Sequence, residues 1–319
     1  MSEPEQKKME VRYLKVEAAF HGQRIDNYLV NLLKGVPRSF IYRVLRRGEV
    51  RVNKGRKPAS YRVQEGDLLR IPPVRAGEQK VLQFDSRLLE GLGQAILYED
   101  DRLVVLNKPA GLAVHGGSGL RFGVIEGMRR LRPMEKQLEL VHRLDRDTSG
   151  CLLISKRRST LRTLHEMLRN NGIDKRYLAL VAGSWPKDRM TVNAPLIKNI
   201  LQSGERMVQV DPLGKAAVSR FTVRQRFASS MLVEAELVTG RTHQIRVHAA
   251  QLGTPILGDP KYGDNASNHA WRALGLKRMF LHAESISFHW PDQQRQLRFV
   301  APLESSLERL LDRLGSDHG

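Results

Sequence analysis

The strongest constraint on the fold is the order of strand-like and helical segments beyond residue 90. Strands are expected where short apolar or β-branched runs lie between turn residues. Six segments fit this description: 95–98, 103–109, 151–155, 177–181, 216–226 and 230–237. Only segments 160–171 and 242–252 show the apolar spacing of a helix. Because the strands outnumber the helices and do not alternate with them, the sequence predicts an α+β fold rather than a doubly wound sheet.

The composition allows about two globular domains and excludes several classes of protein. The chain has 319 residues, of which 41% are hydrophobic, so it can bury a substantial core. Its single cysteine, Cys151, excludes a disulfide framework and a thiolate-based zinc site, and no HExxH pattern occurs. We therefore expect no metal centre.

The hydropathy of the chain argues against membrane insertion and export. No segment approaches the roughly 20 apolar residues that are needed to span a bilayer. Residues 1–8 contain no apolar signal region. The sequence therefore predicts a non-secreted, cytoplasmic protein.

Positive charge predominates and is unevenly distributed. The 53 Lys and Arg residues outnumber the 34 Asp and Glu residues, which gives a formal net charge of +19. Such an excess favours a polyanionic partner, with nucleic acid as the leading candidate and a membrane surface as the competitor. Nine Lys or Arg residues lie from Arg38 to Arg62, where Glu49 is the one acidic residue.

Residues 40–47 are predicted to form a short helix with two different faces. One face is apolar and the opposite face is mainly basic: Phe40, Ile41, Val44 and Leu45 against Tyr42, Arg43, Arg46 and Arg47. A run of charge is usually only a solvated surface. Here the charges lie opposite an apolar stripe and continue into a predicted hairpin, which indicates a surface for phosphates.

An earlier short helix is predicted where apolar residues recur at helical spacing, at Ile25, Leu29, Leu32 and Leu33. The two short helices and the hairpin, with Val50-Arg51-Val52-Asn53 in its first strand and turn, resemble the small α-L RNA-binding module over residues 21–76. The resemblance implies that this module binds RNA through its basic residues. The expected contacts are Arg38, Ser39, Tyr42, Arg43, Arg46, Arg47, Arg51 and Lys54.

The expected domain organisation places this module between two less structured segments. We expect a flexible N-terminal tail over residues 1–20 and a linker over residues 77–90. The larger domain is expected to cover residues 91–305, followed by a C-terminal tail over residues 306–319.

Asp145 lies in the segment His142-Arg143-Leu144-Asp145-Arg146-Asp147-Thr148-Ser149-Gly150, among three basic side chains. Nearby positive charge favours the ionised form of a carboxyl group. An ionised carboxylate that is held in place can act as a nucleophile or stabilise a developing cation. The structural alternative is a salt-bridged Asp in a turn, which would have the same residue types.

Three further patterns in the larger domain are individually weak. Tyr177 lies in segment 175–181, Arg246 lies in segment 240–248, and segment 253–263 is rich in Gly and Pro. Taken singly, such patterns are more often a half-buried strand aromatic, a surface arginine and an ordinary loop than parts of a site.

Together with the Asp145 segment, these patterns resemble the RluA-like family of RNA pseudouridine synthases. The resemblance extends over about residues 94–302, with all motifs in family order, and includes Asn107-Lys108-Pro109 and Leu281-His282-Ala283. It implies a catalytic domain with a mixed, mostly antiparallel sheet. The implied activity is the site-specific isomerisation of uridine in large-subunit (23S) ribosomal RNA by base flipping.

The resemblance also implies roles for individual residues. Asp145 would be the catalytic carboxylate, Tyr177 would stack on the target base, and Arg246 would pair with Asp145. Arg143 would fill the space that the flipped base leaves.

The remaining expected RNA contacts in this domain are His142, Arg241 and His243. The isomerisation transfers no hydride, phosphoryl group or electron, so we expect no cofactor and no metal. We expect a monomer whose partner is ribosomal RNA, without a membrane partner.

Two other functions fit the same residues. An RNA N-glycosidase would let water attack the sugar, but such hydrolysis usually needs a second carboxyl group, for which Asp147 is the one close candidate. A non-enzymatic ribosome-assembly factor would use the positive charge only to hold RNA.

Overall fold

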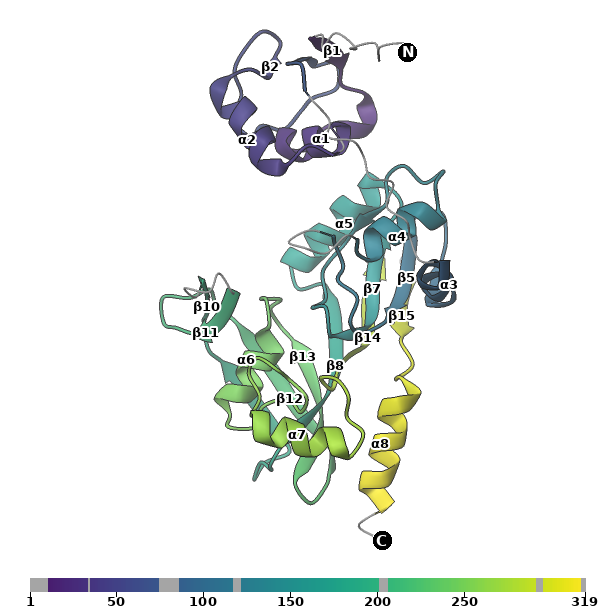
Figure 1. Cartoon of the computed structure of the whole chain (residues 1–319), viewed down its shortest axis with the longest axis vertical. Helices are drawn as coiled ribbons and strands as arrows, with labels where there is room; N and C mark the ends of the chain where they lie inside the picture. The colour runs from purple at the N-terminus through teal and green to yellow at the C-terminus, as the bar shows by residue number, and fades with distance from the viewer. Residues whose placement is uncertain are drawn as a thin grey trace, which may run out of the picture. The chain divides into compact units, whose positions relative to one another are not determined.

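The computed structural model describes residues 11–33, 35–74, 86–116, 122–200, 206–290 and 295–316. The chain divides into two compact units, Met1–Gln83 and Phe84–Gly319 (Figure 1). In the described part of the chain, no helix has the length and apolar character required to cross a membrane.

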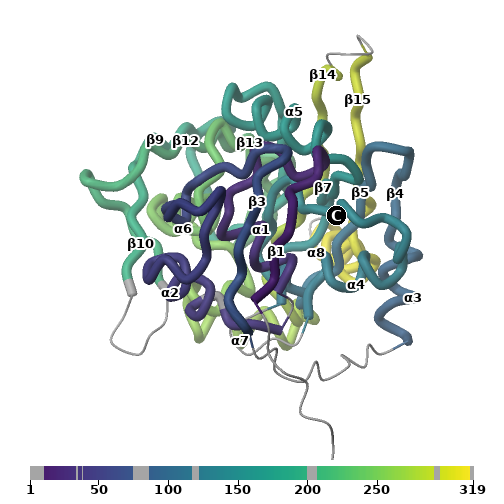
Figure 2. Tube along the Cα trace, turned by 90° about the horizontal axis from the view of Figure 1, so that it is seen from above, coloured from purple at the N-terminus to yellow at the C-terminus, as the bar shows by residue number. Residues whose placement is uncertain are grey.

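Over its described residues, the first unit contains a three-stranded antiparallel sheet and two α-helices. Its sheet has the order β1-β3-β2, and β1 and β3 run side by side (Figure 2). The elements are β1 (Arg12–Lys15), a 3-10 helix (Ala18–Phe20), α1 (Ile25–Leu32), α2 (Arg38–Arg47), β2 (Arg51–Val52) and β3 (Leu68–Ile71).

The predicted two faces of helix α2 are confirmed. Ile41, Val44 and Leu45 are buried in the core of the unit, whereas Arg43 and Arg46 are exposed. The helix ends at Gly48, which has a φ of 69° and donates its N–H to the carbonyl of Leu45. Glycine adopts this left-handed conformation without the steric cost that a side chain imposes.

The expected N-terminal tail is wrong for residues 11–20, while residues 1–10 lie outside the described part of the chain. Strand β1 adds a third strand to the sheet, with Arg12 opposite Ile71 and Lys15 opposite Leu68. Val16 follows the strand and is 2% exposed in the core. Pairing with β3 and burial of Val16 therefore order a segment whose own sequence is too short and polar to predict a strand.

The second unit contains a large mixed sheet, and it confirms the predicted α+β class. Among the described residues, its path is β4-β5-β7-β14-β8-β13-β12-β9, with β6 paired to β7 and β15 paired to β14. Among the strand pairs of the described residues in this sheet, only β7–β14 is parallel. The strands are β4 (Ile96–Glu99), β5 (Leu103–Lys108), β6 (Glu139–Leu140), β7 (Ser149–Ser155), β8 (Ile173–Ala182), β9 (Arg189–Asn193), β12 (Val218–Arg226), β13 (Ser230–Leu237), β14 (Leu281–Trp290) and β15 (Arg295–Val300).

In the part of this unit that the structure describes, a separate antiparallel hairpin and six helices complete the fold. The hairpin consists of β10 (Leu196–Ile200) and β11 (Arg206–Val210). The helices are α3 (Ser86–Gln94), α4 (Val124–Leu131), α5 (Arg158–Arg169), α6 (Gln244–Gln251), α7 (Asn265–Ala273) and α8 (Ser305–Ser316).

Strand β7 is buried along its whole length, which explains its unbroken apolar run. Leu152 and Ile154 belong to the core cluster that also contains residues of α3 and α4. Cys151 and Leu153 alternate with them and belong to a cluster that contains residues of α5. Alternate residues of a strand point to opposite faces, so a strand that is covered on both sides needs apolar residues at nearly every position. This burial fixes the start of β7 at Ser149, four residues after Asp145.

Two other expected segment boundaries are wrong in part. Helix α3 occupies the end of the expected linker over residues 77–90; residues 77–85 lie outside the described part. Its Leu92 is 1% exposed and packs where Gly127 of α4 has no side chain. The expected C-terminal tail is helix α8 up to Ser316, because Leu307 and Leu310 are buried in a core cluster.

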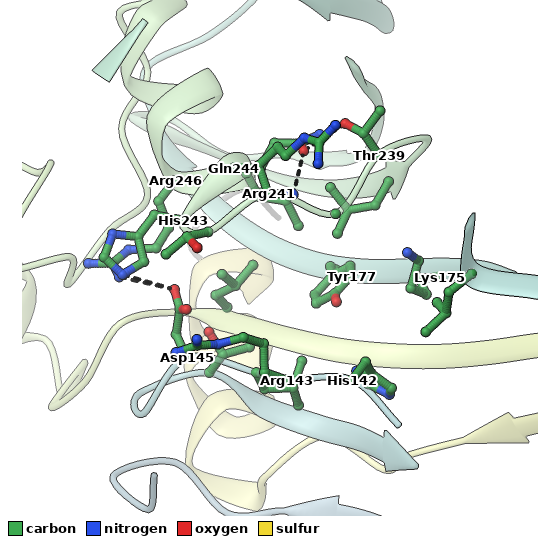
Figure 3. Close-up of a pocket in the computed structure, with 18 of the residues that line it drawn as sticks. His142, Arg143, Asp145, Lys175, Tyr177, Thr239, Arg241, His243, Gln244 and Arg246 are labelled. Carbon is green, nitrogen blue, oxygen red and sulfur yellow. Dashed lines mark hydrogen bonds and ion pairs between the residues drawn. The ribbon is translucent and has the colours of Figure 1, made fainter. Parts of the chain in front are cut away.

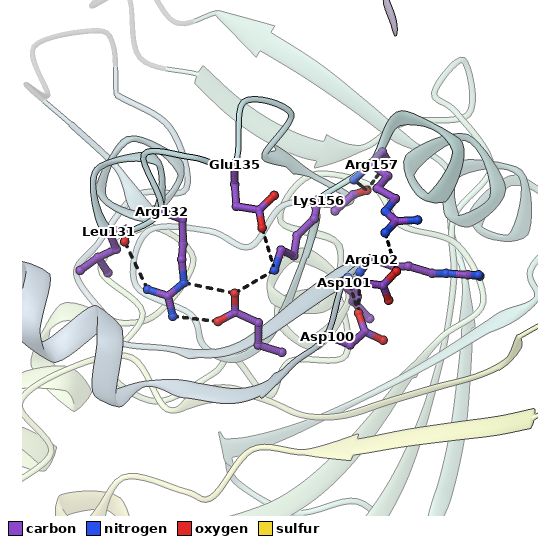
Figure 4. A network of polar contacts seen from close by, with 11 residues as sticks. Asp100, Asp101, Arg102, Leu131, Arg132, Glu135, Lys156 and Arg157 are labelled. Atoms are coloured by element: carbon purple, nitrogen blue, oxygen red, sulfur yellow. Dashed lines mark hydrogen bonds and ion pairs between the residues drawn. The ribbon is translucent and has the colours of Figure 1, made fainter.

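A network of ion pairs connects β4 to the segments that follow α4 and β7 (Figure 4). Glu99 accepts hydrogen bonds from Arg132 at 2.8 Å and from Lys156 at 3.1 Å. Lys156 also pairs with Glu135 at 3.0 Å. These groups are partly exposed, and a single exposed ion pair contributes little to stability. Here Glu99 and Lys156 each take part in two pairs, so the network restrains the ends of α4 and β7 together.

Candidate active site

A pocket of about 700 Å³ opens where the segment before β7, strand β8 and the start of α6 meet (Figure 3). The polar and charged residues that line it are His142, Arg143, Asp145, Thr148, Arg169, Asn171, Lys175, Tyr177, Thr239, Arg241, Thr242, His243, Gln244 and Arg246. The three residues expected to act in catalysis, Asp145, Tyr177 and Arg246, all lie on this pocket.

Asp145 lies in a turn that the start of β7 holds in place. The N–H of Thr148 donates to the carbonyl of Asp145 at 3.2 Å. Gly150 then has a φ of 109°, and a Cβ there would collide with the backbone of Ala283 in β14. The glycine therefore allows β7 to run beside β14, and this pairing places the preceding carboxylate just before the start of an interior strand of the sheet.

The two oxygens of the Asp145 carboxylate have different surroundings. Oδ2 accepts a hydrogen bond from Nη1 of Arg246 at 3.1 Å and lies 3.7 Å from Nε2 of His243. Oδ1 accepts no hydrogen bond from the described residues. The side chain is 19% exposed, so one oxygen is fixed while the carboxylate still reaches the pocket.

Arg246 is held by a second carboxylate, Asp259. Its Nε and Nη2 donate to the two oxygens of Asp259 at 2.7 and 2.8 Å, a bidentate pair in which Asp259 is fully buried. Burial opposes the charged guanidinium, but Asp259 and Asp145 outweigh it and raise the pKa of Arg246 above its ordinary value. Burial also opposes the charged form of Asp259 and by itself would raise the pKa of this carboxyl group. The hydrogen bonds from Arg246 outweigh burial and lower that pKa. Arg246 is therefore a permanent, oriented cation beside Asp145.

Asp259 has a part in the site that was not predicted from the sequence. It lies in the Gly- and Pro-rich segment 253–263, but nothing in that segment identifies its partner. One chemical signal could have indicated a second partner for Arg246. A buried arginine presents more N–H groups than one aspartate, Asp145, can accept, so a second acceptor is expected.

Tyr262 and His243 form a second, neutral support for Asp145. The Tyr262 hydroxyl accepts the N–H of Val208 at 3.0 Å and lies 2.8 Å from Nδ1 of His243, to which it donates. Burial, reinforced by Arg246, outweighs the attraction of Asp145 and lowers the pKa of His243. The neutral ring then carries its proton on Nε2, the atom that faces Asp145.

The backbone at His243 is strained in a way that aims this ring. His243 has a φ of 55° and is the residue before the first turn of α6. Few residues other than glycine adopt this conformation, and it persists only where the surroundings require it. The Tyr262 hydroxyl supplies such a requirement, since it holds the imidazole from the other side.

Tyr177 presents an aromatic surface to the same pocket from strand β8. The residue is 7% exposed and pairs with Ala235 of β13. Burial and the negative charge of Asp145 raise the pKa of its hydroxyl above the ordinary value. The phenol is therefore protonated at neutral pH, and the ring is rigidly held by the sheet.

The other predicted contacts of this unit have different environments. Arg143 is exposed on the pocket. Arg241 is also exposed, but its Nε donates to the carbonyl of Ala216 at 3.0 Å. Nε2 of His142 accepts the N–H of Leu153 at 3.2 Å. The predicted contacts of the first unit lie on α2 and around β2 and are not part of this pocket; the side chain of Arg38 lies outside the described part.

His142 makes the stability of the protein depend on pH. Burial lowers the pKa of His142 from its ordinary value of 6.5 to about 4, so the unfolded chain binds a proton between these values and the folded chain does not. Stability should therefore fall as the pH decreases from 6.5 toward 4. We expect the wild type to lose about 2 kcal/mol more than His142→Gln between pH 7 and pH 4, since one pKa unit corresponds to about 1.4 kcal/mol and the ring is only partly buried.

Urea unfolding of the two proteins at pH 7 and pH 4 measures this difference. Glutamine keeps an acceptor for the Leu153 N–H but does not titrate. The same loss of stability in both proteins would contradict the assignment.

The arrangement combines an ionised carboxylate with one fixed oxygen, a buried cation and an aromatic ring. Arg143 and Arg241 add positive charge at the rim, which suits a flat group attached to a phosphate chain. Within the described ranges, no group of three or more His, Cys, Asp or Glu side chains could hold a metal ion.

Comparison with protein-family models gives two matches. A model described as RNA pseudouridylate synthase matches residues 102–251, and a model of the S4 domain matches residues 23–69. The first match includes Asp145, Tyr177 and Arg246, whereas Asp259 and Tyr262 lie beyond it.

Curated relatives resemble nearly the whole chain. Ribosomal large subunit pseudouridine synthase C of Escherichia coli K12 is 53% identical over 308 residues, which are 95% of this chain and 97% of the relative. The protein of the same name from Yersinia pestis is 52% identical over 303 residues, 94% of this chain and 95% of the relative.

Solved structures share the fold of the second unit. The human RNA pseudouridylate synthase domain containing 4 is similar with a TM-score of 0.60 and 28% identity, over 72% of this chain and 95% of that chain. The human domain containing 1 protein has a TM-score of 0.56 at 22% identity, over 69% of this chain and 94% of that chain, and shows likeness of fold alone.

Proposed function

Because this chain belongs to the RNA pseudouridylate synthase family, we propose that it isomerises particular uridines of large-subunit ribosomal RNA to pseudouridine. The reaction follows from the family. The RNA follows from relatives that are 52–53% identical and are named for the large ribosomal subunit. At the site, the proposal depends on Asp145, whose Oδ2 is held by Arg246 while Oδ1 accepts no hydrogen bond from the described residues.

Asp145 is the proposed catalytic carboxylate. The reaction breaks the bond between N1 of uracil and C1′ of the ribose, and then joins C5 of the rotated ring to the same C1′. The carboxylate can bond to the sugar or to the ring, or it can stabilise an oxocarbenium-like species. Each route needs an ionised oxygen with a fixed direction. Arg246 holds Oδ2, so Oδ1 is the proposed reacting oxygen.

Tyr177 is proposed to stack on the target uracil and to assist removal of the proton from C5. A rigid aromatic face prevents the detached base from leaving the pocket while it turns. The charge of Asp145 is one cause of the raised pKa of the Tyr177 hydroxyl. That charge disappears when Asp145 bonds to the substrate, so the phenolate becomes more accessible as a base at the stage when the C5 proton leaves.

Replacement of Tyr177 by phenylalanine separates stacking from proton transfer. Tyr177→Phe keeps the ring, so RNA affinity and stability should stay close to those of the wild type. Loss of the hydroxyl should slow the release of ring tritium by about 10²-fold or more, the usual contribution of a general base. The measurement is single-turnover tritium release from RNA labelled at C5 of uridine. A wild-type rate would limit the role of Tyr177 to stacking.

The RNA is proposed to bind with its target base flipped out of the helix, which costs a few kcal/mol of unstacking. Arg143 is exposed at the pocket rim and could stack in the vacated space while its charge meets phosphates. Arg241, His142 and His243 line the same pocket and are the proposed further contacts. The S4 domain, with the exposed Arg43 and the other basic residues of α2 and β2, would hold a second part of the RNA.

We further propose that the protein acts as a monomer in the cytoplasm, without a cofactor or a metal. The isomerisation leaves the composition of the substrate unchanged, exchanges only a ring proton with water and moves no hydride or phosphoryl group, so it calls for none. The bacterial relatives are named for the large ribosomal subunit, which bacteria assemble in the cytoplasm.

The decisive experiment uses large-subunit ribosomal RNA from cells that lack this protein, labelled with tritium at C5 of uridine. Purified protein should release tritium to water and leave the RNA strand intact, and mapping of pseudouridines would then identify the positions. Free uracil would support an RNA N-glycosidase instead. Tight binding with no change in the RNA would support an assembly factor.

A further inference from the structure

The exposed face of the sheet in the first unit carries an aromatic ring beside two arginines. Tyr13 of β1 lies directly opposite Arg70 of β3, and Arg70 lies opposite Arg51 of β2, so the three residues form one row across the sheet. Residues at this register point to one face, and the adjacent positions Leu69 and Val52 are buried on the other face. The row therefore projects away from the core.

The apolar groups on this face are unusually exposed. Tyr13 is 60% exposed and Leu68 is 45% exposed. In the adjacent row, Leu68 lies opposite Lys15, which is exposed as well. A sheet that only covers its core from outside would carry polar side chains at these positions, so the two exposed apolar side chains indicate a surface that contacts a partner.

The arginines of the row are oriented but not neutralised. Nε of Arg51 donates to the carbonyl of Gly48 at 3.3 Å, and its Nη1 donates to the carbonyl of Lys54 at 3.4 Å. Nη1 of Arg70 donates to the carbonyl of Glu49 at 2.9 Å. No carboxylate of the described residues pairs with Arg51 or Arg70. Carbonyl partners fix the guanidinium groups and leave their positive charge available to an anion.

These residues line a groove of about 630 Å³ in which positive charge dominates. Five cations and one carboxylate line it: Arg47, Lys54 and Arg56 join Arg51 and Arg70, and the carboxylate is Glu49. Glu49 lies 3.9 Å from Arg47 and partly neutralises that residue. The groove therefore combines an aromatic platform with several cations at its side, which is the composition of a single-strand nucleic-acid site.

We propose that this face, the sheet shelf (Tyr13, Leu68, Arg51 and Arg70), binds an unpaired nucleotide of the RNA substrate. The base would stack on Tyr13 against Leu68, and the adjoining phosphates would contact Arg51 and Arg70. An acidic peptide would satisfy the arginines but would leave the exposed ring without a planar partner. A base-paired helix would satisfy the phosphates but keeps its bases stacked on each other, away from an aromatic side chain.

The shelf differs from the basic face of α2 in both position and origin. Tyr13 and Arg70 lie outside residues 23–69, which match the S4 domain, whereas Arg43 and Arg46 of α2 lie inside them. Strand β1 supplies the ring, so the shelf exists only because the segment before the S4 match joins the sheet. The inference rests on the proposed function only in taking RNA as the partner.

The test is the affinity of the full chain for a fluorescein-labelled oligoadenylate of twelve nucleotides, measured by anisotropy at several salt concentrations. This probe contains no uridine, so it is not a substrate of the catalytic pocket. Tyr13→Ser should weaken binding about tenfold, the usual effect of losing one stacked base, while Tyr13→Phe should bind as the wild type does. Arg51→Gln and Arg70→Gln should each reduce the slope of log affinity against log salt by about 0.7.

Matched controls separate stacking on the shelf from a general loss of affinity or of folding. Leu213→Ser changes a side chain that is 90% exposed in the second unit and should leave affinity unchanged. A duplex RNA probe should bind Tyr13→Ser and the wild type equally. The unfolding transition of Tyr13→Ser should match that of the wild type.

The proposal is overturned if Tyr13→Ser binds the oligoadenylate as tightly as the wild type, or if Tyr13→Phe binds as weakly as Tyr13→Ser. It is also overturned if only Arg43→Gln on α2 weakens binding. Tritium release from ribosomal RNA by the wild type tests the proposed function separately. If the oligoadenylate results contradict the shelf but tritium is released, the proposed function still holds.

Discussion

Asp145→Asn should abolish isomerisation while leaving the protein folded and able to bind RNA. The substitution preserves the shape of the side chain but removes the charge and the nucleophilic oxygen. Loss of a group that forms or stabilises the intermediate typically costs four or more orders of magnitude, so tritium release from C5-labelled ribosomal RNA should fall by at least about 10⁴-fold. RNA affinity should change little, because phosphate contacts supply most of it.

Asp147→Asn is the matched control for this variant. It makes the same chemical change two residues along the same turn, at a position that does not line the pocket. We expect it to retain most of the wild-type rate. Unchanged tritium release by Asp145→Asn would remove the basis of the proposed mechanism, and an equal loss in both variants would point to damage of the turn.

Asp259→Asn should destabilise the fold and impair catalysis together, although Asp259 does not line the pocket. The variant leaves Arg246, whose side chain is 9% exposed, without its bidentate partner. Removing one member of a buried ion pair typically lowers stability by about 3–5 kcal/mol, because the remaining charge stays desolvated. Asp145 still pairs with Arg246 in this variant, so we expect the free energy of unfolding to fall by about 3 kcal/mol. Urea unfolding measures the loss of stability, and tritium release should fall about 10²-fold as Arg246 loses its orientation.

Two comparisons make the result specific. Glu236→Gln removes one charge of the exposed Arg220–Glu236 pair and should change stability by less than about 1 kcal/mol. The double variant Arg246→Met/Asp259→Leu removes both buried charges and should recover much of the lost stability without recovering activity. A stable, fully active Asp259→Asn protein would show that Asp145 alone is enough to orient Arg246.

Local patterns in the sequence were sufficient for the features that depend on neighbouring residues. The spacing of Ile41, Val44 and Leu45 indicated the buried face of α2, because a helix repeats every 3.6 residues. The apolar run 151–155 indicated a buried strand, and the resemblance of the motifs grouped Asp145, Tyr177 and Arg246, which the structure brings to one pocket. The class of fold followed from the order of such segments.

The tertiary structure alone decided which groups meet across distant segments. The second carboxylate on Arg246, the Tyr262 hydroxyl behind His243 and the strand that carries Tyr13 all depend on such meetings. Asp259 lies in a loop that local chemistry explains as an ordinary turn, and β1 is a four-residue strand. The sequence by itself thus determined the class of fold, those elements that have a clear local pattern, and the family that the motifs resemble. Which oxygen of Asp145 is held, and which face carries Tyr13, was decided by packing, because a buried charge or a short strand is stabilised only by partners that the folded chain brings to it.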